Sequence, residues 1–301
     1  MTQPPLPPTW QCVMVCWGDR YGVDYINTLV AAIRAHAARP PRFCLITEAD
    51  KPGLDPAVRI CPFPAFFLRP EYLRGGCQAK LAMFEAGVLP DDLPAIYIDL
   101  DTVVLGDLGQ GVAMMPRRDS ILMLQSAVIP FGPLGRLAAR LTGGRKYARG
   151  NSSVVVFHPA ECSHIAARFR NLAAQYAYNE FRPTVADERF ISWAAQPQMK
   201  ALPRRFAVKF TWEYMFWWTP WLYLKALLPG ARRRRARQVA VTLNDAAIKP
   251  EVLMELPEGG RITDRKGRVL IWSDRTMGPA RGRIIAFYSR FLGSGQGGNH
   301  V

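Results

Sequence analysis

The sequence predicts an α/β protein in which a mostly parallel sheet is flanked by helices. Over residues 11–195, short apolar runs typical of buried strands alternate with longer segments of helical periodicity. Segments of these lengths form strand–helix–strand units, whose strands run parallel. The last third of the chain departs from this alternation and is basic and rich in aromatic residues. We therefore expect an α/β domain followed by a C-terminal extension of different character.

The elements of the first half follow one another closely. A proline-rich lead over residues 1–10 precedes an apolar strand at 11–16, after which Trp17–Arg20 form a turn. Apolar residues recur at steps of three and four over 21–38, which indicates an amphipathic helix. We expect three further strands and one more helix in this half: strands at 42–47, 58–61 and 95–100, and a helix at 78–87.

The second half of the α/β region is less regular. Two strands are expected there, at 121–124 and 153–157. The glycine- and arginine-rich residues 132–150 between them predict a loop with a short helix, and two helices follow at 165–177 and 187–195. The expected domain limits are a lead at 1–10, a catalytic domain at 11–205 with halves 11–110 and 111–205, and a basic region at 206–301.

Composition excludes several classes of protein. Hydrophobic residues make up 49% of the 301 residues, too many for a disordered chain. No apolar run reaches the ~18 residues of a spanning helix. The first residues show neither the basic nor the apolar region of a secretory signal, so we expect a cytoplasmic protein. The six cysteines form no CxxC pair, which favours buried free thiols in a reducing compartment.

Positive charge is concentrated at the C-terminal end. The whole chain has a net charge of +15, of which residues 201–301 supply +11 from 18 basic and 7 acidic residues. Such a balance suits nucleic acid, an anionic membrane surface or a phosphate-rich substrate. Because no nucleic-acid-binding module accompanies the basic run, we expect no nucleic-acid partner.

The most informative tripeptide is Asp99-Leu100-Asp101, which follows the apolar run Ala95–Ile98. Burying two carboxylates there is costly unless a cation meets them. Parallel sheets bind ligands at the carboxyl ends of their strands, and two carboxylates at that edge can hold Mg²⁺ or Mn²⁺. The alternative is that the pair caps a turn in water.

The neighbourhood of this tripeptide resembles a known family. The run from Ala95 to Leu108, AIYIDLDTVVLGDL, is similar to the DxD signature of GT-A fold glycosyltransferases that use nucleotide sugars, especially bacterial enzymes like those of glycosyltransferase family 8. Four further matches occur in the same order as in that family. They are Trp17–Gly22, Lys80–Phe84, Gly150–Val154 and Asp187–Phe190. The resemblance covers roughly residues 11–195.

The resemblance implies a role for each matching residue. Asp99 and Asp101 would hold Mn²⁺ or Mg²⁺. The nucleotide sugar would contact Trp17, Gly18, Asp19, Tyr21, Lys80, Asp99 and Ser152. The catalytic residues would be Asn151, Asp187 and Glu188, although Glu188 stands where the family usually has Gln. Each also has a plain structural interpretation, such as packed aromatics for Trp17 and Tyr21 or a helix N-cap for Asp187.

A second departure concerns the third metal ligand. Family 8 enzymes usually carry a late histidine, and neither similar phrase here, residues 270–273 or 285–289, contains one. Asp274 is close enough to the first phrase to substitute for it. Otherwise the two aspartates, donor phosphates and water would hold the metal, which magnesium tolerates.

The aromatic run Phe210–Leu228 and the arginines that follow it have two interpretations. Trp and Tyr favour membrane interfaces and clustered arginines favour anionic headgroups, which together predict a peripheral segment on the inner face of the cell membrane. Alternatively, the aromatic residues pack into the core and the arginines lie on a solvated loop.

These observations together predict a metal-dependent glycosyltransferase of the hexosyltransferase type. It would move a sugar from a nucleotide diphosphate donor, a UDP-sugar, to a hydroxyl of a cell-envelope glycan or a lipid-linked saccharide in polysaccharide biosynthesis. The alternative is a non-catalytic GT-A-like protein that binds a membrane or a glycan, with which the missing histidine is consistent.

Overall fold

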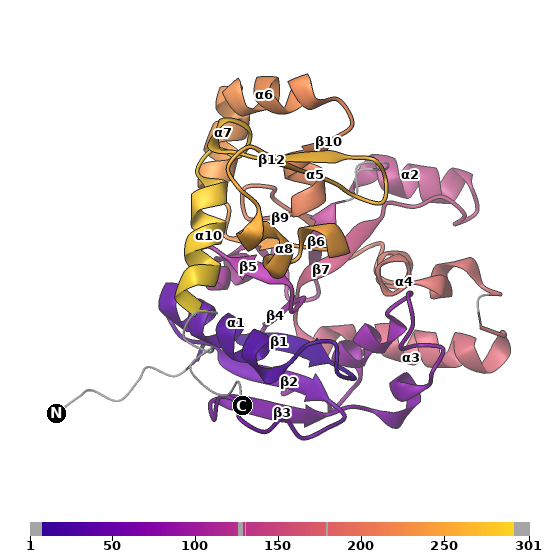
Figure 1. Cartoon of the computed structure of the whole chain (residues 1–301). Helices are drawn as coiled ribbons and strands as arrows, with labels where there is room; N and C mark the ends of the chain where they lie inside the picture. Colours follow the sequence, from indigo (N-terminus) through magenta and orange to yellow (C-terminus); the bar gives the residue numbers. More distant parts are fainter. Residues whose placement is uncertain (1–7, 126–128, 130, 179, 292–301) are drawn as a thin grey trace. The chain divides into compact units, whose positions relative to one another are not determined.

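The structure is a computed structural model that describes residues 8–125, 129, 131–178 and 180–291 (Figure 1). Contacts divide the chain into two compact units, each assembled from segments that are distant in sequence. The first unit comprises Met1–Tyr21, Arg39–Asp99 and Gly109–Leu202, and the second comprises Gly22–Ala38, Leu100–Leu108 and Pro203–Val301. Most of the expected lead at 1–10 lies outside the described residues. The domain limits expected from the sequence stay a prediction.

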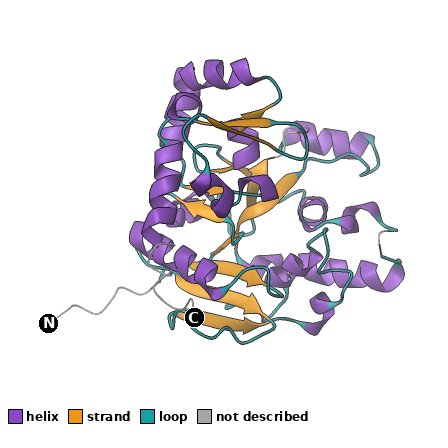
Figure 2. Cartoon of the chain, viewed as in Figure 1, coloured by secondary structure: helices purple, strands orange, loops and turns teal. Residues whose placement is uncertain are grey.

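A seven-stranded sheet forms the centre of the first unit, with the order β3-β2-β1-β4-β7-β6-β8. Figure 2 draws the strands in orange and the helices in purple. The strands β3, β2, β1 and β4 are parallel neighbours, β7 runs antiparallel to both β4 and β6, and β8 is parallel to β6. The sheet is therefore mostly parallel, which confirms the predicted fold class. The strands are β1 (Gln11–Cys16), β2 (Arg42–Thr47), β3 (Val58–Pro62), β4 (Ala95–Ile98), β6 (Ile121–Gln125), β7 (Gly150–Phe157) and β8 (Met199–Leu202).

Helices of the first unit cover one face of this sheet. Alternate strand residues such as Val13, Ile46 and Val155 form a buried core with Phe67 and Phe169 from the helical segments. Because side chains alternate between the two faces of a strand, one row from each strand reaches this core. The helical segments of the first unit are η1 (Ala65–Leu68), η2 (Gln78–Phe84), α2 (Pro133–Leu141), α3 (Pro159–Gln175), η4 (Arg182–Val185) and α4 (Asp187–Ala194), while η3 (Leu108–Met114) begins at the end of a second-unit segment. Of these, η1, η2, α3 and α4 supply residues to this core.

The second unit contains two small sheets. One has the order β5-β11-β9 and the other β10-β13-β12. Their strands are β5 (Thr102–Val104), β9 (Ala207–Lys209), β10 (Met215–Phe216), β11 (Ala240–Thr242), β12 (Gly260–Thr263) and β13 (Val269–Trp272). The helical elements are α1 (Val23–His36), α5 (Phe210–Tyr214), α6 (Thr219–Leu227), α7 (Pro229–Ala236), η5 (Ala246–Ile248), α8 (Pro250–Glu255), α9 (Asp274–Met277) and α10 (Ala280–Phe291).

Several elements differ from the sequence-based expectation, and the strand expected at 153–157 begins at Gly150. The helix predicted at 78–87 is a 3₁₀ helix that ends at Phe84. The strand expected over 95–100 ends at Ile98, and Leu100 and Asp101 form a turn. The helix expected from residue 165 begins at Pro159, whose fixed φ suits the first helical turn. Among the described residues, no helix combines the length and the apolar character needed to cross a membrane.

Candidate functional site

The candidate site of the first unit lies at the edge where β4 ends and β7 begins. Asp99 directly follows β4, and its amide donates to the carbonyl of Ser153 in β7 at 2.9 Å. The carboxylate of Asp99 accepts a hydrogen bond from Tyr97 at 2.6 Å and forms an ion pair with Lys80 of η2 at 2.5 Å. Since parallel sheets bind ligands at the carboxyl ends of their strands, this cluster occupies the edge where a ligand is expected.

Electrostatics keep this pair charged. Burial acts to raise the pKa of Asp99, but the charge of Lys80 and the hydrogen bonds from Lys80 and Tyr97 outweigh it, so this pKa lies below its ordinary value. Burial acts to lower the pKa of Lys80, and the negative charge of Asp99 reverses that effect and raises the pKa well above its usual range. Lys80 is therefore a fixed positive charge at the end of β4.

The start of β7 meets the first turn of α4 at the same edge. Ser152 donates to a carboxylate oxygen of Asp187 at 2.5 Å, and the side-chain amide of Asn151 donates to Glu188. The backbone amide of Asp187 donates to the carbonyl of Gly76 at 2.9 Å. Adjacent residues of one strand thus bind adjacent residues of one helix, and the structure brings Asn151, Ser152, Asp187 and Glu188 together as polar pairs.

Asp187 differs from Asp99 in its electrostatics. Burial raises the pKa of Asp187 to about 6, and the charge of Lys80 and the hydrogen bond from Ser152 offset burial only in part. Lys80 thus acts on both carboxylates but is ion-paired to only one of them. A carboxyl group that titrates near neutral pH can accept or release a proton, as general acid–base chemistry requires.

The turn after β1 contains the residues expected to contact a nucleotide. Gly18 has φ of +59°, in the left-handed region that favours glycine. Its amide donates to Glu48 at 2.7 Å, and its carbonyl accepts from Lys51 at 3.3 Å. Trp17 is half-buried against the core, whereas Asp19 is exposed. The turn is thus held by side chains of the segment that follows β2.

The end of this turn lies near η2. Tyr21 is half-buried, with the guanidinium of Arg20 5.5 Å from its ring centroid. Burial raises the pKa of the Cys77 thiol, and the charges of Lys80 and Arg20 oppose that shift. Cys77 precedes η2 and has φ of +53°. Arg20 is therefore within electrostatic range of the helix that carries Lys80.

The second unit holds the other aspartate of the tripeptide. Asp101 is 9% exposed, and its Oδ2 forms an ion pair with Lys249 at 2.5 Å. The ammonium of Lys249 also donates to the carbonyl of Leu243 at 2.9 Å. Lys249 was not expected from the sequence, because a single lysine before a proline belongs to no motif that would mark it as a partner of Asp101. Only its distance from Asp101 identifies it.

Asp99 and Asp101 each supply a carboxylate, the type of ligand that a hard divalent cation prefers. Each already pairs with a lysine of its own unit, Asp99 with Lys80 and Asp101 with Lys249. No group of three or more His, Cys, Asp or Glu side chains among the described residues is arranged to hold a metal. Asp274 is ion-paired with Arg281 at 3.5 Å.

These features together define an α/β protein with a GT-A fold, in which a polar edge of the central sheet carries carboxylates and a lysine. Solved glycosyltransferase structures share this fold, although no protein-family model and no curated protein matches the chain. An active-site mutant of LgtC matches with a TM-score of 0.55 and 14% identity, over 94% of this chain and 95% of the LgtC chain.

Other solved glycosyltransferases are similar at the same level. LgtC in complex with donor and acceptor sugar analogues matches with a TM-score of 0.51 and 12% identity, over 93% of this chain and 96% of that one. The bifunctional glycosyltransferase WbbM matches with a TM-score of 0.54 and 12% identity, over 97% of this chain and 53% of its own. At these identities the similarity establishes the fold, and it confirms the GT-A architecture that the sequence motifs implied.

Proposed function

We propose that the protein is a glycosyltransferase that moves a sugar from a nucleotide diphosphate donor, a UDP-sugar, to an acceptor hydroxyl. The observation that supports this most is the cluster of Lys80, Asp99, Asn151 and Asp187 at the ligand edge of a GT-A sheet. The cited LgtC structure is a galactosyltransferase complex with donor and acceptor sugar analogues, so the fold is known to accommodate both.

In this proposal each residue of the cluster has a different role. Lys80 is a fixed cation suited to the diphosphate of the donor. Asn151 can donate and accept hydrogen bonds, which suits sugar hydroxyls, and its contact with Glu188 orients it. Asp187, with its raised pKa, is placed to exchange a proton or to stabilise positive charge at the sugar. Trp17 and Tyr21 would hold the base by stacking.

The proposed cofactor is Mn²⁺ or Mg²⁺ bound by the carboxylates of Asp99 and Asp101. When bound, it would neutralise the charge that develops on the diphosphate as the bond to the sugar breaks. The remaining coordination positions would be filled by donor phosphates and water. For the acceptor we propose a cell-envelope glycan or a lipid-linked saccharide, which the basic C-terminal third supports.

The decisive experiment is calorimetry of UDP binding with and without manganese. Wild type should bind UDP more tightly with manganese, and Asp101→Ala should lose that increase, because one of two metal ligands is gone. Asp101→Asn has a side chain of nearly the same volume and serves as a second variant in case Asp101→Ala misfolds around Lys249. Asp91→Asn removes an exposed carboxylate elsewhere and should behave as wild type.

Manganese-stimulated UDP binding that survives in both Asp101 variants would contradict the metal assignment. Failure of wild type to bind UDP in either condition would contradict the proposed donor.

A further inference from the structure

The helices α6 and α7 form a consecutive pair in the second unit, joined at Leu228 (Figure 1). On α6, Leu222 is buried and Lys225 is half-buried, whereas Tyr223, Leu224 and Leu227 are exposed. The three exposed residues fall within about a third of the helix circumference, opposite the buried side. One face of α6 therefore packs inward while an apolar face remains outside.

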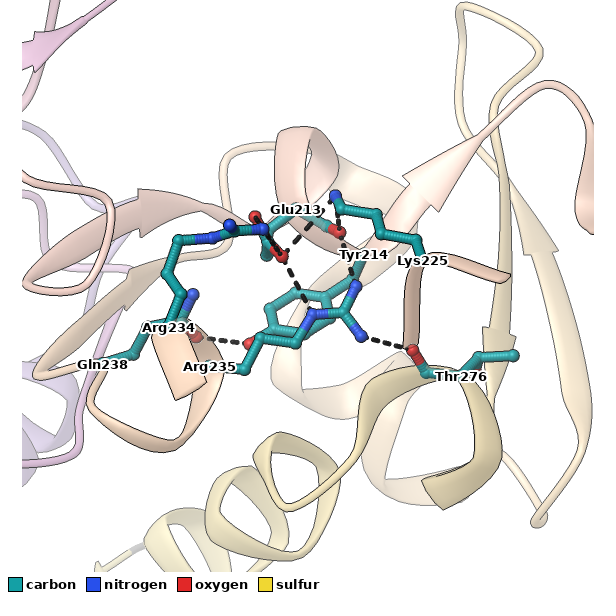
Figure 3. A network of polar contacts seen from close by, with 7 residues as sticks. All are labelled: Glu213, Tyr214, Lys225, Arg234, Arg235, Gln238 and Thr276. Atoms are coloured by element: carbon teal, nitrogen blue, oxygen red, sulfur yellow. Dashed lines mark hydrogen bonds and ion pairs between the residues drawn. The ribbon is translucent and has the colours of Figure 1, made fainter. Parts of the chain in front are cut away.

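A buried ion network holds this helix pair in place (Figure 3). Glu213 of α5 is 1% exposed and accepts hydrogen bonds from Arg234 at 2.9 Å and from Arg235 at 2.8 Å. Lys225 of α6 donates to the Glu213 carbonyl at 2.7 Å, and Arg235 also donates to the carbonyl of Thr276 at 2.6 Å. Lys225 also forms an ion pair with the Glu213 carboxylate at 3.5 Å, so both helices are fixed to the same residue.

This network divides the arginine run into two groups. Arg235 is 1% exposed and Arg234 is half-buried, so both serve the interior. Arg232, Arg233 and Arg237 are exposed, and no ion pair to them is formed within the described part of the chain. The arginines that follow the aromatic run therefore do not act as one group: Arg234 and Arg235 pair inside the unit, and Arg232 and Arg233 remain available to a partner.

The helix pair and the residues before it carry exposed apolar and basic side chains. Leu227 is 70% exposed, and Trp217 and Trp218, which precede α6, are 62% and 57% exposed. Exposed apolar residues on one short segment are unusual for a soluble surface and mark an interaction site. Hereafter the interfacial surface means these exposed residues of the pair and its approach: Trp217, Trp218, Tyr223, Leu224, Leu227, Leu228, Arg232, Arg233 and Arg237.

We propose that the interfacial surface binds the headgroup region of an anionic lipid bilayer. Trp and Tyr favour the interface between hydrocarbon and water, leucines gain free energy when they leave water, and arginines attract anionic headgroups. The buried Glu213 network already holds the helix pair in place, so little conformational entropy is lost when the surface binds. The charge of the surface matches an anionic bilayer. This inference is independent of the proposed transfer reaction, because vesicle binding is measured without donor or acceptor.

The test is sedimentation of the full chain with phosphatidylcholine vesicles that do or do not contain phosphatidylglycerol. Wild type should sediment with the anionic vesicles at ~0.1 M salt and less at ~1 M, where the Debye length falls to ~3 Å. The double variant Arg232→Ser/Arg233→Ser should weaken partitioning roughly 30-fold, at about 1 kcal/mol for each arginine near the surface.

Matched controls separate this surface from the overall positive charge. Arg204 and Arg205 are an adjacent exposed pair in the same unit, so Arg204→Ser/Arg205→Ser removes equal charge elsewhere. Leu224→Ser/Leu227→Ser should weaken binding roughly tenfold or more, whereas Leu134→Ser/Leu137→Ser on α2 replaces leucines that are also exposed and should not.

Each outcome decides the proposal. Loss confined to the two variants of the interfacial surface, with unchanged thermal midpoints, supports it. Equal loss in the control variants would show that net charge or general hydrophobicity drives binding and would overturn it. Equal sedimentation with neutral vesicles, no sedimentation, or self-association abolished by Leu224→Ser/Leu227→Ser in place of lipid binding would overturn it as well.

Discussion

Asp187 and Asp99 are buried carboxylates of one cluster whose pKa values are shifted in opposite directions. Asp99 is ion-paired to Lys80 at 2.5 Å and accepts a hydrogen bond from Tyr97, so its pKa is lowered. Asp187 has only the Ser152 hydroxyl and the more distant charge of Lys80 against its burial, so its pKa is raised. A small difference in partners therefore separates a permanent anion from a group that titrates near neutral pH.

The raised pKa of Asp187 predicts a specific dependence of stability on pH. In the folded state this pKa is about 6 instead of 3.8, so between these values the native state holds more protons than the unfolded state. Its contribution to the free energy of unfolding is thus lost as pH rises, by roughly 3 kcal/mol in total. Asp187→Asn lacks this loss, so its stability relative to wild type should increase between about pH 4 and about pH 7.

Urea unfolding of both proteins at the two pH values measures this difference. The other carboxylates titrate equally in the two proteins. The diagnostic quantity is therefore how the difference in free energy of unfolding between Asp187→Asn and wild type changes from one pH to the other. Glu180→Gln, an exposed carboxylate of the first unit, should track wild type throughout. A constant difference between Asp187→Asn and wild type across this range would show that Asp187 titrates at its ordinary pKa.

At the scale of elements, one buried carboxylate, that of Glu213, ties α7 to α5. Burial acts to raise the pKa of Glu213, but Lys225, Arg234 and Arg235 outweigh it and hold this pKa below its ordinary value. The indole of Trp217 adds a contact at the start of this segment, donating to the carbonyl of Lys266 at 2.8 Å. The helix pair is therefore anchored to the rest of the second unit by specific polar contacts.

Removal of that carboxylate should destabilise the second unit. Glu213→Gln leaves the guanidinium of Arg235 buried without a counter-charge, so we expect a loss of roughly 3–5 kcal/mol in the free energy of unfolding. Glu255→Gln, an exposed carboxylate of α8, should change it by less than about 0.5 kcal/mol. Denaturant unfolding followed by tryptophan fluorescence measures both, and a cost below about 1 kcal/mol for Glu213→Gln would mean that the network contributes little.

At the scale of the whole molecule, ligand binding should be visible as a change in thermal stability. A ligand that binds only the native state at about 100 times its Kd adds ~2.7 kcal/mol to the free energy of unfolding. For a chain of this size that corresponds to a rise in Tm of roughly 5 °C. We expect such a rise for a UDP-sugar with manganese, and a smaller one without the metal.

A screen of nucleotide sugars by differential scanning fluorimetry measures this rise and ranks the donor sugars. Manganese alone and a sugar phosphate without nucleotide are the controls, and neither should produce the full shift. An equal shift with manganese alone would attribute the effect to the metal. Slow hydrolysis of the ranked donor in the absence of acceptor would then separate a transferase from a protein that only binds it.

Much of the first unit follows from local pattern. The strands β1 and β2 have the limits that the apolar runs predict, because a buried strand must be apolar along its length. The residues singled out after β4 and at the start of β7 do lie at one edge, since β4 and β7 are neighbours in the sheet. Element ends were less predictable, as β4 shows by ending at Ile98.

Local residue pattern is enough to predict the fold class and the acidic pair that follows β4, because both depend on neighbouring residues. The residues at the start of β7 and of α4 were implied by the family resemblance, which rests on the order of its motifs. Contacts between distant segments are needed to show that Lys249 pairs with Asp101, 148 residues earlier, and that Arg235 is buried while Arg232 and Arg233 remain exposed. This is because the residues next to a charged side chain in the sequence do not indicate which distant residue it will pair with. Its burial and its pairing are set by residues that the fold brings to it.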